Sequence, residues 1–307
     1  MTVSLLSPDE IQEEKFSVPL QHKYVLISPA YNEERFIARM IETIASQTVL
    51  PGHWVIVDDG STDGTQEIIK LYAQRYPFIE RICLPTRRTR KPGGEGAVQQ
   101  ALAVARSYSY DFLARFDADL EFNSDYIARI LDEFSRDEKL GIAGGGLYLK
   151  AETGRFKLEK VPRYHVRGAL KMYRRECLEE IGELCTYMGW DTIDEVYAWK
   201  HGWRTRSFSE NRVIHRRPTG DGLSKIEIAR KRGHGEYYTW SHPLFVLAKA
   251  IRVAFGSPTS GFYFLRGFLE CYRKHEDRLQ DSDFKRIRRK QQLRRIISLG
   301  ILSEPKL

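Results

Sequence analysis

Two pairs of aspartates follow apolar segments of the chain, and carboxylates in such pairs could hold a divalent cation. Asp58 and Asp59 come directly after one apolar run, and Asp117 and Asp119 come directly after another. In an extended segment Asp117 and Asp119 point to the same side, so that both can bind one hard cation together with phosphate oxygens. Such a cation would stabilise a departing nucleotide diphosphate. The alternative is a turn, because aspartate often hydrogen-bonds the local backbone at strand ends.

These acids are expected to lie on an α/β sheet. Over the first 120 residues, short apolar runs that suit buried strands alternate with segments of helical periodicity. The alternation predicts right-handed crossovers and a largely parallel sheet with helices on both faces. Ligands of such sheets bind beyond the carboxyl ends of the strands, which is where the aspartates are expected. The expected strands are residues 24–28, 54–57, 79–84 and 112–116.

The remainder of the chain changes character. A helix is expected over 124–134. The segment 140–150 follows, and its Gly144-Gly145-Gly146 would allow close approach of a ligand or form a bulge. A loop at Gly189 is expected to open a helix that stops at Gly202. Two further strands, 204–208 and one ending at His215, are expected to close this part of the chain. The last 90 residues are expected to be mainly helical.

Composition restricts the class of protein. The 307 residues are 42% hydrophobic and 29% charged, which is typical of a folded globular chain and excludes a disordered one. Residues 244–255 form the longest apolar stretch, and Lys249 and Arg252 interrupt it, so no spanning helix is expected. The four cysteines lack metal-type spacing, and residues 1–15 lack a signal-peptide pattern. We therefore expect a cytoplasmic, reduced protein.

The positive charge is concentrated in the last third of the chain. The net charge is +8, but residues 204–307 contain 23 Lys/Arg against 10 Asp/Glu. This asymmetry favours an anionic partner, although basic helices are equally often solvated surfaces.

Several common α/β chemistries lack their motifs. No G-x-G-x-x-G follows the first expected strand, and neither a G-x-x-x-x-G-K-[ST] loop nor a G-x-S-x-G elbow occurs. Dinucleotide binding, P-loop chemistry and the hydrolase nucleophile elbow are therefore disfavoured.

Three motifs in order resemble those of the family 2 glycosyltransferases. They are Ser28-Pro29-Ala30-Tyr31-Asn32-Glu33-Glu34, the segment 57–65 (VDDGSTDGT) and Asp117-Ala118-Asp119. The resemblance implies the nucleotide-sugar-binding GT-A fold, a Rossmann-like α/β sheet. It divides the chain into a polar leader (1–22), a catalytic domain (23–215) and a basic helical extension (216–307). Within the catalytic domain, residues 23–120 would bind the nucleotide and residues 121–215 the acceptor.

The resemblance also implies a donor site. Asp58 or Asp59 would accept a hydrogen bond from the base, which suits uracil or guanine. Asp117 would lie near the ribose and the metal, and Asp119 would bind the metal, Mn²⁺ or Mg²⁺. For Glu33 the alternative is charge complementarity at a helix N-terminus. The side chains expected to line the nucleotide pocket are Pro29, Ala30, Tyr31 and Glu33.

Members of this family invert the anomeric carbon, which requires a base that accepts the proton of the acceptor hydroxyl. The family places it in a Gly-Glu-Asp-x-x-Asp-like segment, for which this chain has Gly189-Trp190-Asp191-Thr192-Ile193-Asp194. Asp191 is the predicted base, Trp190 would offer a flat face to a sugar, and Asp194 is a rival that could instead cap the helix. Glu195 is expected to face outward.

His215 and the basic segments complete the predicted contacts. His215 resembles a histidine that some GT-A enzymes place on the metal, although a single histidine is more often structural. Arg216 and Arg217, which follow it, suit phosphate. A cluster over 87–91 could meet pyrophosphate or be solvated. The absence of a recognised motif argues against nucleic acid as a partner.

The C-terminal extension carries a possible membrane surface. Basic residues crowd 285–295, and an apolar-aromatic stretch covers 262–268. Together they suit anionic lipid headgroups, so the protein would attach peripherally to the inner face of a membrane; the alternative is a helical cap on the fold.

The favoured hypothesis is a metal-dependent inverting glycosyltransferase. It would use a UDP-, GDP- or dTDP-linked sugar and a saccharide or lipid-linked acceptor, in surface polysaccharide or glycolipid synthesis. One alternative is a sugar-phosphate nucleotidyltransferase, although the segment 28–34 lacks the glycine-rich loop that such enzymes carry. Another is a non-catalytic protein that binds lipid or polyanion on the same scaffold.

Overall fold

The computed structural model describes residues 23–85, 95–150, 154–182, 184, 188–217, 220 and 222–297. The predicted leader over 1–22 and the basic cluster over 87–91 lie outside these residues. The described strands are β1 (Tyr24–Ala30), β2 (His53–Asp58), β3 (Ile79–Cys83), β4 (Phe112–Phe116), β5 (Leu120–Phe122), β6 (Leu140–Lys150), β7 (Phe156–Leu158), β8 (Leu170–Arg174) and β9 (Arg204–His215). The described helices are α1 (Ile37–Ala45), α2 (Thr65–Arg75), α3 (Glu95–Ala105), α4 (Tyr126–Arg136), α5 (Arg175–Ile181), α6 (Trp190–Lys200), α7 (Lys225–Tyr238), α8 (Pro243–Gly256), α9 (Pro258–Lys274) and α10 (Ser282–Ile297).

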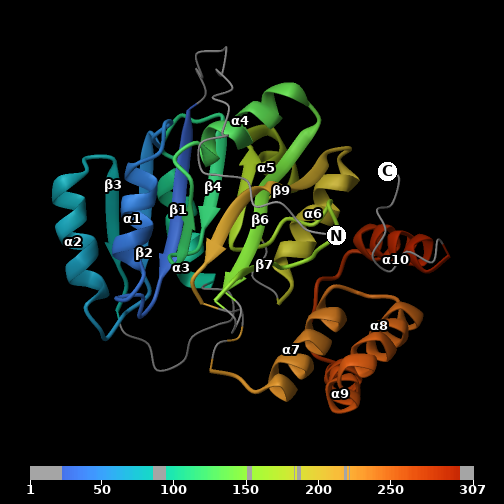
Figure 1. The fold of residues 1–307 in the computed structure, drawn as a ribbon. Coiled ribbons are helices and arrows are strands. Elements are labelled where there is room, and N and C mark those ends of the chain that lie inside the picture. The colour runs from blue at the N-terminus through green and yellow to red at the C-terminus, as the bar shows by residue number, and fades with distance from the viewer. Residues whose placement is uncertain are drawn as a thin grey trace, which may run out of the picture.

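The strands form one sheet in the order β3-β2-β1-β4-β8-β6-β9-β5, with β7 paired to β6 (Figure 1). β1 pairs in parallel with β2 and β4, and β2 with β3, so the predicted α/β sheet is confirmed. The sheet is less parallel than predicted beyond β4, because β8 runs antiparallel to both β4 and β6. The carboxyl ends of β1, β2 and β4 lie at one edge, as parallel pairing requires.

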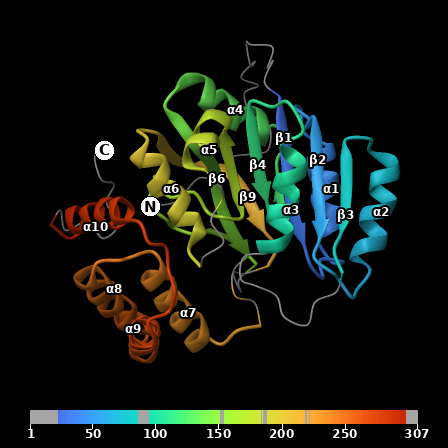
Figure 2. The ribbon, with the colours of Figure 1, turned by 180° about the vertical axis from the view of Figure 1, so that it is seen from behind.

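Side chains alternate along the strands between two cores. Leu26, Trp54 and Phe116 pack with α1, α2 and α4 on one face. Val25, Val57 and Leu113 pack with α3, α5 and α6 on the other face, and α3 is seen in front of the sheet in Figure 2. This two-sided burial explains why the first strands are continuous apolar runs.

The three glycines of β6 serve packing. A Cβ on Gly145 would lie 2.3 Å from the carbonyl oxygen of Asn211 on β9, which excludes any side chain there. The register between β6 and β9 shifts between Gly145 and Gly146, so the bulge interpretation holds. Because β9 continues through this irregularity, the two strands predicted over 204–208 and up to His215 are one strand.

The C-terminal helices pack in two ways. α7, α8 and α9 share a small core that contains Tyr237, Val246, Phe264 and Phe268. Separately, Phe284 of α10 is fully buried among residues of α6, so that the extension is fixed to the sheet-bearing part of the chain. No helix among the described residues is long and apolar enough to cross a bilayer.

The predicted apolar-aromatic surface over 262–268 is only partly a surface. Phe264 and Phe268 lie in the core of the extension, and Phe262 is exposed. Four exposed apolar side chains instead follow one stripe of α8, at spacings of three and four residues, with Phe255 88% exposed. The stripe consists of Leu244, Leu247, Ile251 and Phe255, which we call the α8 stripe.

Candidate active site

A cleft of about 640 Å³ opens at the carboxyl ends of β1 and β4. It lies where ligands of parallel α/β sheets are expected to bind. Most of the side chains predicted from the sequence line it, namely Pro29, Ala30, Tyr31, Glu33, Asp117, Asp119, Trp190, Asp191 and His215.

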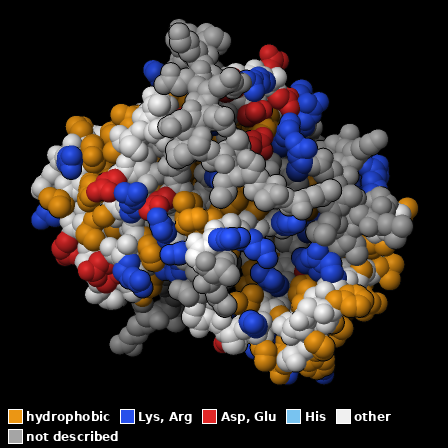
Figure 3. All heavy atoms as spheres, in the orientation of Figure 1, with side chains coloured by type: hydrophobic (Ala, Val, Ile, Leu, Met, Phe, Trp, Pro, Cys, Tyr) orange, Lys and Arg blue, Asp and Glu red, His pale blue; other side chains and the backbone are white. Residues whose placement is uncertain are grey.

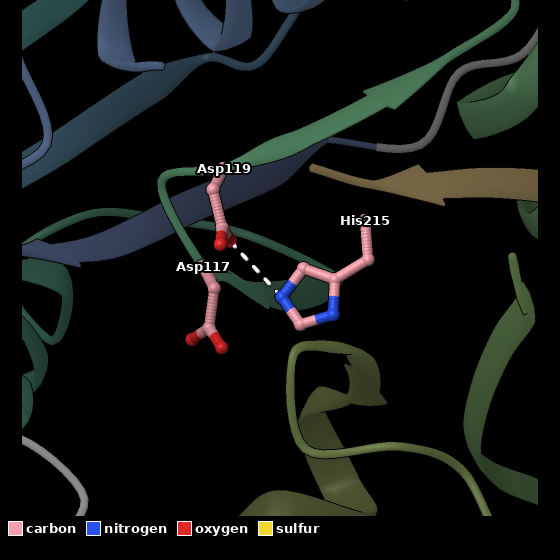
Figure 4. A group of neighbouring side chains, drawn as sticks. All are labelled: Asp117, Asp119 and His215. Atoms are coloured by element: carbon pink, nitrogen blue, oxygen red, sulfur yellow. Dashed lines mark ion pairs between the residues drawn. The ribbon is translucent and has the colours of Figure 1, made fainter. Parts of the chain in front are cut away.

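Three of these side chains could hold a metal ion. Asp117 and Asp119 come from the turn after β4 and His215 from the end of β9; Asp119 and His215 face each other, and Asp117 lies beside them (Figure 4). One ligand atom from each lies within 4.8 Å of the others, and Nε2 of His215 lies 3.2 Å from Oδ1 of Asp119. Burial lowers the pKa of His215, but the hydrogen bond to Asp119 and the charges of both aspartates outweigh it and raise that pKa. Two carboxylates and one imidazole are a donor set that suits a divalent cation, and the imidazole favours a transition metal such as Mn²⁺ over Mg²⁺.

Arg217 connects the first motif to this acidic group. Its guanidinium pairs with Glu33, and its Nε lies 3.5 Å from Oδ2 of Asp119. Burial raises the pKa of Glu33 to about 7, although Arg217 opposes the shift. Glu33 therefore faces the cleft and a cation, rather than acting only on the dipole of α1.

Asp191 lies in the first turn of α6 and lines the cleft. Two glycines allow the backbone to bring this turn to the cleft. Gly189 precedes the helix with φ of 85°, a conformation that favours glycine. Gly168 lies against the other side, where a Cβ would come within 2.7 Å of the Trp190 ring and 3.2 Å of the Asp191 Cβ. The burial of Asp191 raises its pKa, but His165, whose Nε2 lies 3.8 Å from Oδ2, Lys171 and other cations outweigh this and lower it. Asp191 is therefore held as a carboxylate.

The sequence did not single out Arg115. Its side chain lies between Asp117, one of the three candidate metal ligands, and the ring of Trp190. Its guanidinium lies 4.1 Å from the centre of the Trp190 ring, and its Nη1 lies 3.5 Å from Oδ1 of Asp117. The same group donates a hydrogen bond to the carbonyl oxygen of Gly168. The available signal was a single arginine inside the otherwise apolar, fully buried strand β4.

Asp194 and Glu195 lie away from the cleft, in a buried network around Lys171. Nζ of Lys171 donates to Oδ1 of Asp194 at 2.7 Å, and the hydroxyl of Tyr173 donates to Oδ2 at 2.6 Å. The prediction that Glu195 faces outward is wrong: it is 1% exposed, and its carboxylate accepts the backbone N–H of Val166. Asp194 therefore has a structural role, and its carboxylate is not accessible to a substrate.

Asp58 and Asp59 are also buried and do not line the cleft. Asp58 accepts hydrogen bonds from the backbone N–H of Ser61 at 3.1 Å and from Gln66 at 2.7 Å. These bonds stabilise the turn after β2. Asp58 thus acts as strand-end aspartates often do, by hydrogen-bonding the local backbone.

The sheet and the cleft at its edge together define the GT-A fold. A mannosyltransferase from Pyrobaculum calidifontis, solved with GDP-Man and Mn²⁺, superposes with a TM-score of 0.54 at 19% identity, over 84% of this chain and 76% of that chain. Residues 25–190 match the family model described as Glycosyl transferase family 2. The chain belongs to this family.

Curated relatives share parts of the chain. Chondroitin synthase of Escherichia coli is 31% identical over 124 residues, which cover 40% of this chain and 16% of that protein. Dodecaprenyl-phosphate galacturonate synthase of Rhizobium johnstonii is 26% identical over 226 residues, which cover 67% of this chain and 62% of that protein. The chain thus spans less than two thirds of the length of these relatives.

Proposed function

We propose that the protein transfers a sugar from a nucleotide-diphosphate sugar to a hydroxyl of a saccharide or lipid-linked acceptor, with inversion at the anomeric carbon. The observation that carries the proposal is that one cleft contains both the Asp117–Asp119–His215 group and the carboxylate of Asp191. In this assignment residues 23–120 bind the donor, residues 121–215 bind the acceptor and residues 216–307 form an extension. The proposed role is in surface polysaccharide or glycolipid synthesis.

Asp117, Asp119 and His215 would hold the metal ion, Mn²⁺ or Mg²⁺. The group fits a cation because one oxygen of each carboxylate and one ring nitrogen of His215 lie within 4.8 Å of one another. When bound, the ion supplies positive charge to the diphosphate. Arg217, which already faces Asp119, would add a second positive charge on that side.

Asp191 would act as the base. The acceptor oxygen attacks the anomeric carbon and forms the new glycosidic bond, while the bond from that carbon to the diphosphate oxygen breaks and its electron pair leaves with the nucleoside diphosphate. The hydroxyl proton passes to the carboxylate of Asp191. The lowered pKa of Asp191 keeps the group charged before the proton arrives, while it also makes the carboxylate a weaker base. Trp190 would offer the sugar the part of its ring that Arg115 leaves open.

The acceptor is proposed to be presented from a membrane. The α8 stripe exposes apolar side chains that a protein dissolved in water has no need to expose, and Lys and Arg side chains gather beside the C-terminal helices (Figure 3). Apolar residues flanked by basic ones suit the interface of an anionic bilayer. The name of the Rhizobium johnstonii relative also includes a lipid phosphate.

Calorimetric titration with UDP, GDP and dTDP, each with and without Mn²⁺, tests the proposal. We expect one diphosphate to bind in a metal-dependent manner, and Asp119→Ala to lose this binding because a cation ligand is removed. Asp191→Asn should keep the binding but reduce transfer by about 10²–10⁴-fold, the usual contribution of a general base. If folded wild-type protein binds none of the diphosphates, the proposal is wrong.

A further inference from the structure

A second pocket adjoins the cleft on the far side of Asp191. It has a volume of about 370 Å³ and lies between the segment 159–167, α6 and the helices α7, α8 and α10. Gly189, Asp191 and Arg167 line both the cleft and this pocket. A ligand that fills the pocket therefore abuts the proposed base.

Positive charge is concentrated in the pocket. Seven Lys/Arg residues and four Asp/Glu residues line it, which leaves an excess of positive charge. Three of the four acids already have partners within the protein: Glu236 pairs with Lys249, Glu159 lies 3.0 Å from Arg167, and Glu195 accepts from Val166. The fourth is Asp191.

Three arginines in the pocket lack a direct ion pair with any residue that the structure describes, although the charge of Arg288 helps to lower the pKa of the nearby Glu236. Among the described residues, no carboxylate forms an ion pair with Arg232, Arg252 or Arg288. Arg288 is only 8% exposed, and its Nε has no hydrogen-bond partner there, although its Nη1 donates to Gln291. A buried guanidinium with an unused donor is costly unless a ligand supplies the acceptor.

Arg295 adds a further charge beside Arg288. Its Nη1 donates to the hydroxyl of Tyr164 at 2.6 Å. Burial and the charges of Arg288 and Arg252 lower the pKa of Arg295, even though Tyr164 and Glu236 oppose the shift. Like charges held together in a partly closed space are stabilised by a bound anion. Two arginines of the basic segment 285–295 thus face into the protein, and not toward a bilayer as predicted.

We propose that this pocket binds a phosphate group of the acceptor and so places the acceptor hydroxyl at Asp191. Phosphate fits better than a single carboxylate, because it carries more acceptor oxygens and guanidinium groups pair with it in a bidentate manner. The phosphate is bound and takes no part in the bond changes. The role as an acceptor site rests on the proposed transfer, whereas the binding of phosphate does not.

The test is calorimetric titration of the full chain with farnesyl phosphate, farnesol and inorganic phosphate, in EDTA so that metal-dependent nucleotide binding does not contribute. We expect farnesyl phosphate to bind and farnesol not to bind. Arg252→Gln and Arg288→Gln should each weaken binding about ten-fold or more, because a charge-assisted contact is lost. The control is Arg286→Gln on the same helix, an exposed arginine that pairs with Asp283 and does not line the pocket; it should bind as wild type does.

The outcomes separate the possible ligands and the two proposals. Equal binding of farnesol and farnesyl phosphate, or binding unaffected by both pocket variants, would overturn the phosphate site. Inorganic phosphate binding as tightly as farnesyl phosphate would support the site and assign it to free phosphate. Arg252 is exposed, so its variant keeps the test valid if Arg288→Gln fails to fold. If wild type shows no metal-dependent binding of a nucleotide diphosphate in the separate titration with Mn²⁺, that result would count against the proposed sugar transfer and not against the phosphate site.

Discussion

Lys171 lies completely buried on β8 and contacts the beginning of α6 at three points. Its Nζ donates to the main-chain oxygen of Asp191 at 2.6 Å and to Asp194 at 2.7 Å, and lies 3.4 Å from Glu195. Burial lowers the pKa of Lys171, but the neighbouring carboxylates outweigh it and raise that pKa, so the ammonium is retained. Lys171 therefore fixes the turn of backbone from which the Asp191 side chain projects.

Replacing Lys171 should strongly destabilise the fold. Lys171→Met leaves Asp194 and Glu195 as buried carboxylates without their cation, so the free energy of unfolding should fall by about 3–5 kcal/mol. Lys200→Met on α6 removes a partly exposed pair with Asp281 and should cost about 1 kcal/mol or less. Urea denaturation of both variants measures the difference. Equal losses would show that the buried network does not depend on the lysine charge.

At the residue scale, sequence predicts best where a backbone rule applies. Asp117 and Asp119 could be expected at the cleft, because the carboxyl ends of parallel strands meet at one edge. Arg115 and Lys171 could not, since each lies on a buried strand and its partners come from segments that only the folded chain brings near. Asp194 is a rival to Asp191 in the sequence, yet helical geometry turns it into the protein, where it accepts hydrogen bonds from Lys171 and Tyr173.

At the scale of elements, α10 secures the helix that carries Asp191. Phe284 of α10 is fully buried against Ile193 and Val196 of α6, and Tyr197 of α6 donates a hydrogen bond to Asp281 at 2.9 Å. The residues that precede α10 along the chain thus reach α6 as well. Sequence periodicity predicted helices in this region but gave no partner for them, because an apolar stripe does not reveal which surface covers it.

Phe284→Ala should test how strongly α10 is attached. Truncation of a fully buried phenylalanine leaves a cavity and should lower the free energy of unfolding by about 3–5 kcal/mol. Ile297→Ala, at an exposed position of the same helix, should change it by about 0.5 kcal/mol or less. Guanidinium denaturation followed by circular dichroism and tryptophan fluorescence provides the measurement. If both variants unfold like wild type, α10 is not coupled to the rest of the fold.

At the scale of the whole molecule, charge and apolar exposure are both placed at one end. The C-terminal helices hold the α8 stripe on their outer side and the second pocket on the side toward the sheet. Figure 1 shows α7, α8, α9 and α10 at the side of the sheet where β6 and α6 lie, far from β3 and α2. An interface with a bilayer would therefore form beside the second pocket, away from the outer strands β2 and β3 of the proposed donor-binding half.

Sedimentation with vesicles should detect this interface. Wild type should bind vesicles that contain anionic lipid, less tightly at high salt because basic residues contribute. Phe255→Ser should weaken partitioning about ten-fold or more, the effect of losing one inserted aromatic side chain. Leu71→Ser is the matched control, since Leu71 is an exposed apolar residue of α2 at the opposite end. Equal weakening by the two substitutions would rule out the α8 stripe as the contact.

The wall shared by the cleft and the second pocket has a thermodynamic consequence. Arg167 and Asp191 line both spaces, so a charged ligand on one side changes the electrostatic free energy of the other. Linkage makes this effect reciprocal: if the donor alters the affinity for the acceptor by some factor, the acceptor alters the affinity for the donor by the same factor. The concentrations and binding rates of the two substrates then set the order in which they bind. The cooperativity between the two binding events arises from the residues that line both spaces.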